Sequence, residues 1–339
     1  MLTCMVLCFA LISPSVYRPS SAVINPLTLV SSLRMAPDVV GNFDHPAIDP
    51  PNHRLFVTPE AYKSVLVVDY RTGKIIHKIS GIGVPHAVLY RKDVDRIYLT
   101  DGDPGELKIF DGTSYRLLKS IKLSEHTDSI AYDPRSKFLY VISGGKAAKE
   151  SSSTIYIIDT TSNMVVGGIT IDSDALEAMA IDQEHGRLYV NDTAKNRIDV
   201  IDIKTKSLVA RWPLTLGQKN TSMAIDQAGN RLFVGCRSGR MVIFDTTLGK
   251  EITSLPLTTG VDDMVFDPDV KRIYASCGDD GGVIEIYDEV GGNQFTHIAH
   301  IPSGPMAKTA LLSKALNLYF VAVPHHGDTD AIIQVYKVH

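Results

Sequence analysis

The sequence predicts an all-β protein, a seven-bladed β-propeller whose last blade is closed by an N-terminal strand. Two recurring phrases and a missing final strand carry this prediction. The first phrase is a strand-like run that leads into an aspartate, and this aspartate recurs about every 43 residues. Its copies read VLVVDYRTGK, LKIFDGTSYR, IYIIDTTSNM, IDVIDIKTKS, MVIFDTTLGK and IEIYDEVGGN. The second phrase precedes it and reads HRLFV, DRIYL, KFLYV, GRLYV, NRLFV, KRIYA and LNLYF. Such repetition is typical of a ring of blades, whereas a β-sandwich has no reason to repeat the same phrases.

Each repeat unit contains four short strands, which we call A to D from the centre of the ring outward. Strand A is a phrase rich in small residues, such as HPAID in the first unit and DMVFD in the sixth. Strand B is the RLYV-like phrase, strand C ends in the aspartate, and strand D follows a turn such as RTGK or TLGK. Four antiparallel strands in about 40 to 50 residues are typical of a propeller blade. The aspartates at the ends of the C strands are interpreted as turn formers.

The seventh unit lacks a strand D, because the chain stops after AIIQVYKVH at residues 331–339. An unassigned strand-like segment, PLTLVSSLRMAP at residues 26–37, stands directly before the first strand A. This segment is predicted to be the missing outer strand of the seventh blade. Pairing the two ends of the chain in one blade closes the ring and covers an edge that would otherwise invite aggregation.

The first residues form a separate apolar segment, LTCMVLCFALI, which has about the length of a signal-peptide core and is too short to span a bilayer. Ser20 and Ala22 are small residues suited to a cleavage site, although no Lys or Arg precedes the apolar run. We expect residues 1–22 to be a signal peptide and residues 23–339 to be a single propeller domain without a transmembrane span. The protein is then periplasmic or secreted. A wrongly chosen start codon and a short membrane anchor remain alternatives.

Composition narrows the range of functions. Hydrophobic residues make up 44% and charged residues 21% of the chain, as in a soluble globular protein. The formal net charge of −4 offers no basic surface, so no nucleic-acid role is expected. We expect a monomer. Cys236 and Cys277 end neighbouring B strands, and two free thiols are favoured over a disulfide, with metal ligation as a lesser option.

The segment RLYVNDTAKNRIDVIDIKTKSLVARWPL resembles the repeat of the YVTN-type, YncE-like bacterial β-propellers. The resemblance covers roughly residues 27–338 and implies seven blades and an export signal. It implies function less well, since such propellers serve as ligand-binding scaffolds and related ones include lactonases, lyases and copper enzymes. A single tryptophan, Trp212, is a poor match to the docking motifs of quinone-dependent dehydrogenases.

The starts of the A strands are the candidate functional positions, because in a propeller they line the mouth of the central channel. One set of equivalent positions is predicted to hold Asp44, Pro85, Asp128, Glu177, Thr221, Asp262 and Ala307. The next set is predicted to hold His45, His86, Ser129, Ala178, Ser222, Asp263 and Lys308. Of these, we interpret Asp44, His86, Asp128, Glu177, Asp262, Asp263 and Lys308 as ligand-binding residues.

The stretch PHHGD places His325 and His326 in the B–C connection of the seventh unit, which lies on the same face as the starts of the A strands. We expect His326 to point inward, because the glycine after it lets the loop fold over the channel. His45, His86, His325 and His326 are the candidate metal ligands. His53, His77 and His185 fall in A–B turns or in strand D and are expected to be solvated.

Carboxylates at one channel mouth repel one another, by about 4 kcal/mol per pair at about 4 Å and an effective dielectric constant of about 20. They persist if they are solvated, protonated, paired with Lys308 or neutralised by a cation. Nitrogen donors beside them suit Zn, Cu, Ni or Fe, whereas Ca prefers carboxylates alone. A wet, polar channel whose aspartates only cap backbone N–H groups is the alternative.

Three functions compete. The leading prediction is an exported propeller that binds a divalent metal ion or a small polar ligand at an acidic, histidine-bearing channel mouth. The second is a metal-dependent hydrolase, lactonase-like, or a lyase, with His45 or His326 as the catalytic base. The third is a scaffold for a protein partner. The loop at residues 143–153, SGGKAAKESSS, lacks the context of a phosphate-binding loop and is expected to cover the channel mouth.

Overall fold

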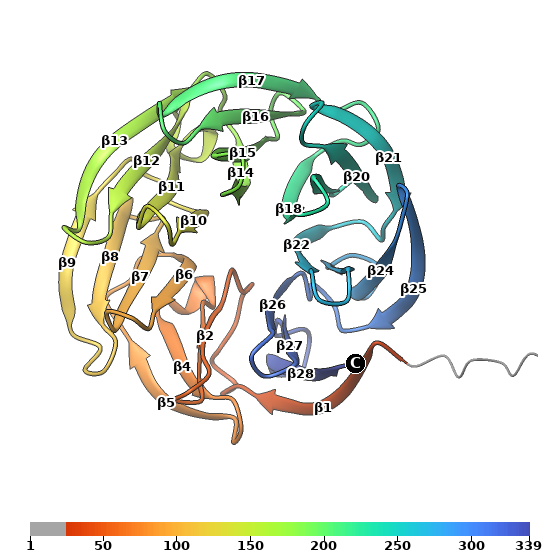
Figure 1. The fold of residues 1–339 in the computed structure, drawn as a ribbon. Coiled ribbons are helices and arrows are strands. Elements are labelled where there is room, and N and C mark those ends of the chain that lie inside the picture. The colour runs from red at the N-terminus through yellow and green to blue at the C-terminus, as the bar shows by residue number, and fades with distance from the viewer. Residues whose placement is uncertain (1–24) are drawn as a thin grey trace, which may run out of the picture.

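The computed structural model describes residues 25–339, which form seven four-stranded antiparallel sheets arranged as blades around a central axis (Figure 1). Blades one to three contain β2 (Ala47–Asp49), β3 (Arg54–Val57), β4 (Val65–Asp69), β5 (Lys74–Ile79), β6 (Pro85–Arg91), β7 (Arg96–Asp101), β8 (Glu106–Asp111), β9 (Leu117–Lys122), β10 (Ile130–Asp133), β11 (Phe138–Gly144), β12 (Ser153–Asp159) and β13 (Met164–Ile171). The predicted seven-bladed fold is confirmed.

The second half of the ring repeats the same order of strands. Blades four to seven contain β14 (Leu176–Asp182), β15 (Arg187–Asp192), β16 (Arg197–Asp202), β17 (Ser207–Pro213), β18 (Asn220–Asp226), β19 (Arg231–Cys236), β20 (Arg240–Asp245), β21 (Lys250–Pro256), β22 (Val261–Asp267), β23 (Arg272–Cys277), β24 (Val283–Gly291), β25 (Gln294–Pro302), β26 (Thr309–Ser313), β27 (Leu318–Val323), β28 (Ile332–Val338) and β1 (Leu27–Arg34). Two short 3-10 helices, η1 (Glu60–Tyr62) and η2 (Lys146–Ala148), lie in B–C connections.

The B and C strands are buried on both faces, because each blade packs against the blades on either side. The apolar run of β20 is buried along its length, from Met241 to Phe244, and Asp245 at its end is half-buried. Asp245 accepts hydrogen bonds from the N–H groups of Thr247 and Leu248 in the following turn. Asp69 does the same for Arg71 and Thr72 in blade one. Asp111, Asp159 and Asp202 also accept from N–H groups of the following turn, so these aspartates are turn formers, as predicted. Asp288 is the exception, because it lies within β24 and pairs with Arg272.

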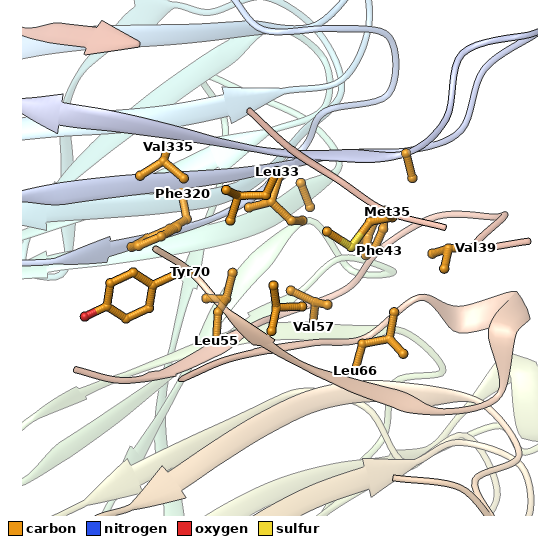
Figure 2. Close-up of a cluster of buried hydrophobic side chains, with 14 residues drawn as sticks. Leu33, Met35, Val39, Phe43, Leu55, Val57, Leu66, Tyr70, Phe320 and Val335 are labelled. Atoms are coloured by element: carbon orange, nitrogen blue, oxygen red, sulfur yellow. The ribbon is translucent and has the colours of Figure 1, made fainter. Parts of the chain in front are cut away.

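The N-terminal strand β1 closes the ring. It pairs antiparallel with β28, from Leu27 opposite Val338 to Arg34 opposite Ile332. The buried cluster of Figure 2 joins the two ends of the chain, since Leu33 and Met35 pack there with Leu55 and Leu66 of blade one. The same cluster includes side chains from β27 and β28 of blade seven. The predicted closure of the last blade is confirmed.

The predicted signal peptide, residues 1–22, and its cleavage site before Val23 lie outside the described residues. Within residues 25–339, no helix has the length and apolar character needed to cross a membrane. Export therefore remains a prediction that rests on the sequence.

Candidate functional site

The starts of the A strands form a ring at one end of the channel, but the ring differs from the predicted one in blades two and seven. Arg91 pairs with Arg96 across the A–B turn of blade two, just as Asp182 pairs with Arg187 in blade four. The turns thus match in length, which places His86 one position earlier in the ring than predicted. In blade seven, Ala310 pairs with Val321, which places Lys308 one position earlier than predicted. The corrected ring contains Asp44, His86, Asp128, Glu177, Thr221, Asp262 and Lys308.

We use the term cup for this ring together with the four side chains that contact it or lie close to it, namely His45, Glu60, Arg237 and Asp263. The correction matters for its chemistry. Under the predicted register, the first ring was almost purely acidic, and the bases lay in the second. In the structure, His86 and Lys308 belong to the same ring as the carboxylates, and they lie beside Asp44, Asp128 and Asp262.

Asp44 and His45 stand directly before β2 and are held from both sides. The Asp44 N–H donates to the carbonyl of Thr58 on blade one, at 3.1 Å. The His45 N–H donates to Asp44 Oδ1 at 2.9 Å, and His45 Nδ1 lies 2.9 Å from Asp263 Oδ1 on blade six. Asp263 Oδ2 in turn accepts from the N–H of Ala310 on blade seven, at 2.8 Å. These bonds link three blades across the site of closure.

His86 completes a carboxylate–imidazole cluster. Its Nδ1 lies 2.7 Å from Asp44 Oδ2 and 3.8 Å from Asp128 Oδ1. Burial alone lowers the pKa of His86, but the hydrogen bond to Asp44 and the charge of Asp128 outweigh it and raise the pKa to about 9. Burial likewise raises the pKa of Asp44, yet the neighbouring His45 and His86 hold it well below its usual range. The cluster is an ion pair network at neutral pH.

Glu60 joins this cluster from η1 in the B–C connection of blade one. Asp44, Glu60 and His86 each offer one ligand atom, and these atoms lie within 4.8 Å of one another. Burial and the charge of Asp44 raise the pKa of Glu60. Across residues 25–339, this is the one group of at least three acidic, histidine or cysteine side chains with such spacing.

Two cations of the cup, Arg237 and Lys308, pair with Asp262 of blade six. Arg237, from the B–C connection of blade five, pairs with Asp262 Oδ1, and Lys308 Nζ lies 2.7 Å from Asp262 Oδ2. Burial lowers the pKa of Lys308, but the charge of Asp262 outweighs it and keeps the amine protonated. Pairing with Lys308, one of the four possibilities that the sequence left open for these carboxylates, is therefore present, and Arg237 adds a second positive charge.

Among the carboxyl groups of the ring, Glu177 is the one whose ionised form is stabilised least. Burial raises its pKa to about 8, and the negative charge of Asp128 adds to the shift, while Arg237 opposes it. Glu177 is therefore largely protonated at neutral pH and can donate a hydrogen bond. Partial protonation and pairing with cations are thus the means by which so many carboxylates share one channel mouth.

His325 and His326 lie in the predicted connection, between β27 and β28. His325 is half-buried and His326 is exposed, and the backbone of His326 pairs with Thr329 in the same loop. In the part of the chain that the structure describes, no side-chain hydrogen bond or ion pair joins either histidine to the cup. Their role as metal ligands stays a prediction, and the structure supplies no contact that supports it.

Three residues near the cup were not predicted from the sequence: Glu60, Arg237 and His126. They come from B–C and D–A connections, whose lengths and sequences vary from blade to blade, so the repeat gives no register for them. His126 Nε2 lies 3.7 Å from Asp128 Oδ2. Together with Lys146 and Ala147 of η2 it lines a cavity of about 440 Å³ that also contacts Glu177. The loop at residues 143–153 thus stands beside the cup, and that it covers the channel mouth stays a prediction.

The remaining candidates lie outside the cup. Cys236 and Cys277 are buried, free thiols, as favoured from the sequence. Burial raises the pKa of Cys236 to about 12, so this group is an unreactive thiol and a poor ligand. His53 and His185 lie in A–B turns, and His77 lies in β5, where its ring stacks on that of Tyr115.

Comparison with known proteins identifies relatives over part of the chain. The uncharacterized protein YncE of Salmonella typhi is 32% identical over 108 residues, and YncE of Salmonella typhimurium is 31% identical over 108 residues. Each match covers 32% of this chain and spans 30% of the length of the relative. No family model matches the chain.

Comparison of structures supports the fold alone. A chain in a crystal structure of the mitotic checkpoint complex superposes with a TM-score of 0.75 at 16% sequence identity, and the match covers 100% of both chains. At this identity, the likeness carries no information on function. The chain is thus similar to the YncE proteins over 32% of its length, and its seven-bladed ring has the β-propeller fold.

Proposed function

We propose that this propeller is an exported binding protein whose cup holds a divalent transition-metal ion. The observation that carries the proposal is the group of Asp44, Glu60 and His86, whose ligand atoms lie within 4.8 Å of one another. Two carboxylates and one imidazole are a donor set that suits Zn, Mn, Fe, Co or Ni better than Ca, which prefers oxygen alone. Three protein donors leave coordination positions open for water or a small polar ligand.

The ion pairs of the cup set a condition on this proposal. His86 binds a metal ion as the neutral imidazole, so the ion must displace the proton that Asp44 stabilises. The ion also has to compete with the positive charge of Lys308, which acts on both Asp44 and Glu60. A cup that stays metal-free and binds a small polar ligand through its hydrogen-bonding groups is therefore the alternative.

A metal-dependent hydrolase or lyase is a second candidate, favoured by Glu177. A carboxylic acid with a pKa of about 8 beside an open metal site has the properties of a general acid. Burial lowers the pKa of His45, but the charges of Asp263 and Asp44 outweigh it and hold the pKa well above its usual range. The His45–Asp263 pair therefore offers a second proton donor, oriented by a carboxylate. Turnover of a lactone by the zinc-loaded protein, and its loss in Glu177→Gln, would favour the enzyme over the binding protein.

Elemental analysis of the purified protein, followed by calorimetric titration with zinc, tests the metal proposal. His86→Ala is expected to weaken zinc binding at least ten-fold, or roughly 1.4 kcal/mol. The matched control is His185→Ala, because His185 Nδ1 also lies 2.8 Å from an aspartate, Asp182, but has no third donor in reach. Equal zinc affinity in both variants, or no zinc binding by the wild type at micromolar concentration, would contradict the proposal.

Export is tested separately. The mature chain is expected to begin at Val23, which N-terminal sequencing of the protein from the periplasm or the medium will show. An intact Met1 on protein recovered from the cytoplasm would overturn this part of the proposal and leave the metal site untouched.

A further inference from the structure

A cavity of about 320 Å³ lies on the central axis directly beyond the cup. The A strands of blades two to seven contribute to its lining, together with the two residues directly before β2 of blade one. Its wall is mostly aliphatic, with Leu89, Met179, Met223, Val265 and Leu311 among the lining residues. We call this cavity the chamber. Its volume lies within the range of about 300 to 1,000 Å³ that is typical of pockets for small molecules.

The chamber and the cup share two side chains. His45 and Asp263 line the chamber and form the hydrogen bond that links blades one and six at the cup. The polar ring and the apolar wall therefore belong to one continuous site, with its charged groups at one end and its aliphatic groups at the other. A molecule that fills both parts must itself have a polar end and an apolar end.

The sign of the polar end is indicated by one group of charges in the cup, which adjoins the His45–Asp263 pair that lines the chamber. Asp262 is a single carboxylate that pairs with two cations, Arg237 and Lys308. The side chain of Arg237 is 40% exposed, so its guanidinium keeps donors free for a ligand. This clamp, Arg237 with Lys308, carries an excess positive charge, and Asp262 stands directly before Asp263, which lines the chamber.

We propose that the small ligand of this cup is an amphipathic anion, whose carboxylate or similar head binds the Arg237–Lys308 clamp while its aliphatic part enters the chamber. This inference rests on the proposed binding function and assigns the class of the ligand. A guanidinium pairs with a carboxylate through two parallel hydrogen bonds, which fixes the direction in which the tail leaves the head. Burial of the tail against the aliphatic wall supplies affinity in proportion to its length.

The test is a calorimetric titration of the metal-free protein with butanoate, hexanoate and octanoate. If the tail enters the chamber, each added CH₂ lowers the Kd about four-fold. If only the head binds, the three Kd values are equal. Arg237→Gln is expected to weaken the binding of all three acids by a similar factor, at least about ten-fold, because the head is common to them.

The decisive variant is one in which a larger side chain fills the chamber. Val265→Phe narrows the chamber and is expected to abolish the dependence of the Kd on chain length. Val290→Phe is the matched control, since Val290 belongs to the same blade but is 59% exposed. Should Val265→Phe fail to fold, Leu311→Phe replaces it. The inference is overturned if the Kd still depends on the chain length of the acid when the chamber is filled. It is also overturned if octanoate does not bind at millimolar concentration.

The outcome is independent of the metal test. Zinc titration depends on Asp44, Glu60 and His86, whereas the response to chain length depends on the chamber wall. Zinc binding without a chain-length effect would refute the amphipathic ligand and leave the metal proposal standing. A chain-length effect without zinc binding would support the ligand class and refute the metal.

Discussion

Two histidine-bearing loops, residues 43–46 with the sequence FDHP and residues 324–328 with the sequence PHHGD, carry nearly the same chemistry and reach different positions. In the first loop, Asp44 and His45 are held by hydrogen bonds to blades one and six. In the second loop, the backbone of His326 bonds to Thr329 of the same loop, and its side chain is exposed. The first loop contributes to the cup, and the second has no hydrogen bond to it in the described chain.

The difference shows that the position of a residue in the ring, more than its type, decides whether its side chain contributes to the cup. FDHP stands directly before an A strand, so its backbone direction is set by the innermost strand of the blade. PHHGD joins strands B and C and is free to close on itself. The comparison predicts that changes to the first loop, or to the blades that hold it, have large effects on stability or zinc affinity. Changes to the second loop should have small effects on both.

The largest effect is expected from removing the strand that closes the ring. Deleting residues 23–36 exposes the edge of β28 and removes Leu33 and Met35 from the buried cluster of Figure 2. Each of these side chains contributes about 1.5 to 3 kcal/mol through burial, so the deletion is expected to lower the thermal midpoint sharply or to prevent folding. Unchanged thermal unfolding, followed by circular dichroism, would contradict the role of β1.

Replacing Glu177 is expected to have the next largest effect, through the pH dependence of stability. The pKa of Glu177 is raised from 4.5 to about 8, so the unfolded chain loses this proton at lower pH than the folded chain does. Above pH 4.5, the wild type therefore loses stability as pH rises toward 8, by roughly 4 kcal/mol at most. Glu177→Gln removes this loss, because the amide stays neutral.

Denaturant unfolding at pH 5 and pH 8 measures this effect. A smaller decline remains in Glu177→Gln above pH 6.5, because the stabilising proton of His86 is lost as pH rises through about 9. Asp328→Asn in the exposed loop of blade seven is the control and should keep the full decline of the wild type. If the free energy of unfolding depends on pH in the same way in the wild type and in Glu177→Gln, Glu177 is ionised in the folded protein.

The metal affinity of the cup should depend on pH in the opposite direction. Because the pKa of His86 is about 9, the imidazole is mostly protonated below that pH, and zinc must displace the proton. Affinity is expected to rise about ten-fold per pH unit between pH 6 and pH 8. Calorimetric titration at three pH values measures the slope. A flat profile would show that His86 is not a ligand.

The smallest effect is expected in the loop of blade seven. His326→Ala removes an exposed side chain without a hydrogen bond to the cup, so it should change the free energy of unfolding by less than about 0.5 kcal/mol. Zinc affinity should remain that of the wild type. A ten-fold loss of zinc affinity in His326→Ala would show instead that this loop folds over the channel and supplies a ligand.

The fold could be predicted from the sequence because the repeat unit occurs seven times. Closure of the ring followed from the missing strand D of the seventh unit. The members of the cup could also be named, since Asp44, Asp128 and Asp262 stand at equivalent points of the repeat. The positions predicted for His86 and Lys308 were wrong by one residue, because only the pairing of the A and B strands fixes where each A strand stands in the ring. Glu60 and Arg237 were missed because they lie in connections that do not repeat, where only the folded chain brings them to the ring.

The most direct test of the account is the position of a bound metal ion. Crystals of the protein soaked in zinc, measured at the zinc absorption edge, give an anomalous difference map that locates the ion without any assumption about its ligands. We expect one peak between Asp44, Glu60 and His86, within about 2.0 to 2.2 Å of a ligand atom from each. A peak beside His325 and His326, or the absence of any peak in the cup, would contradict the central claim.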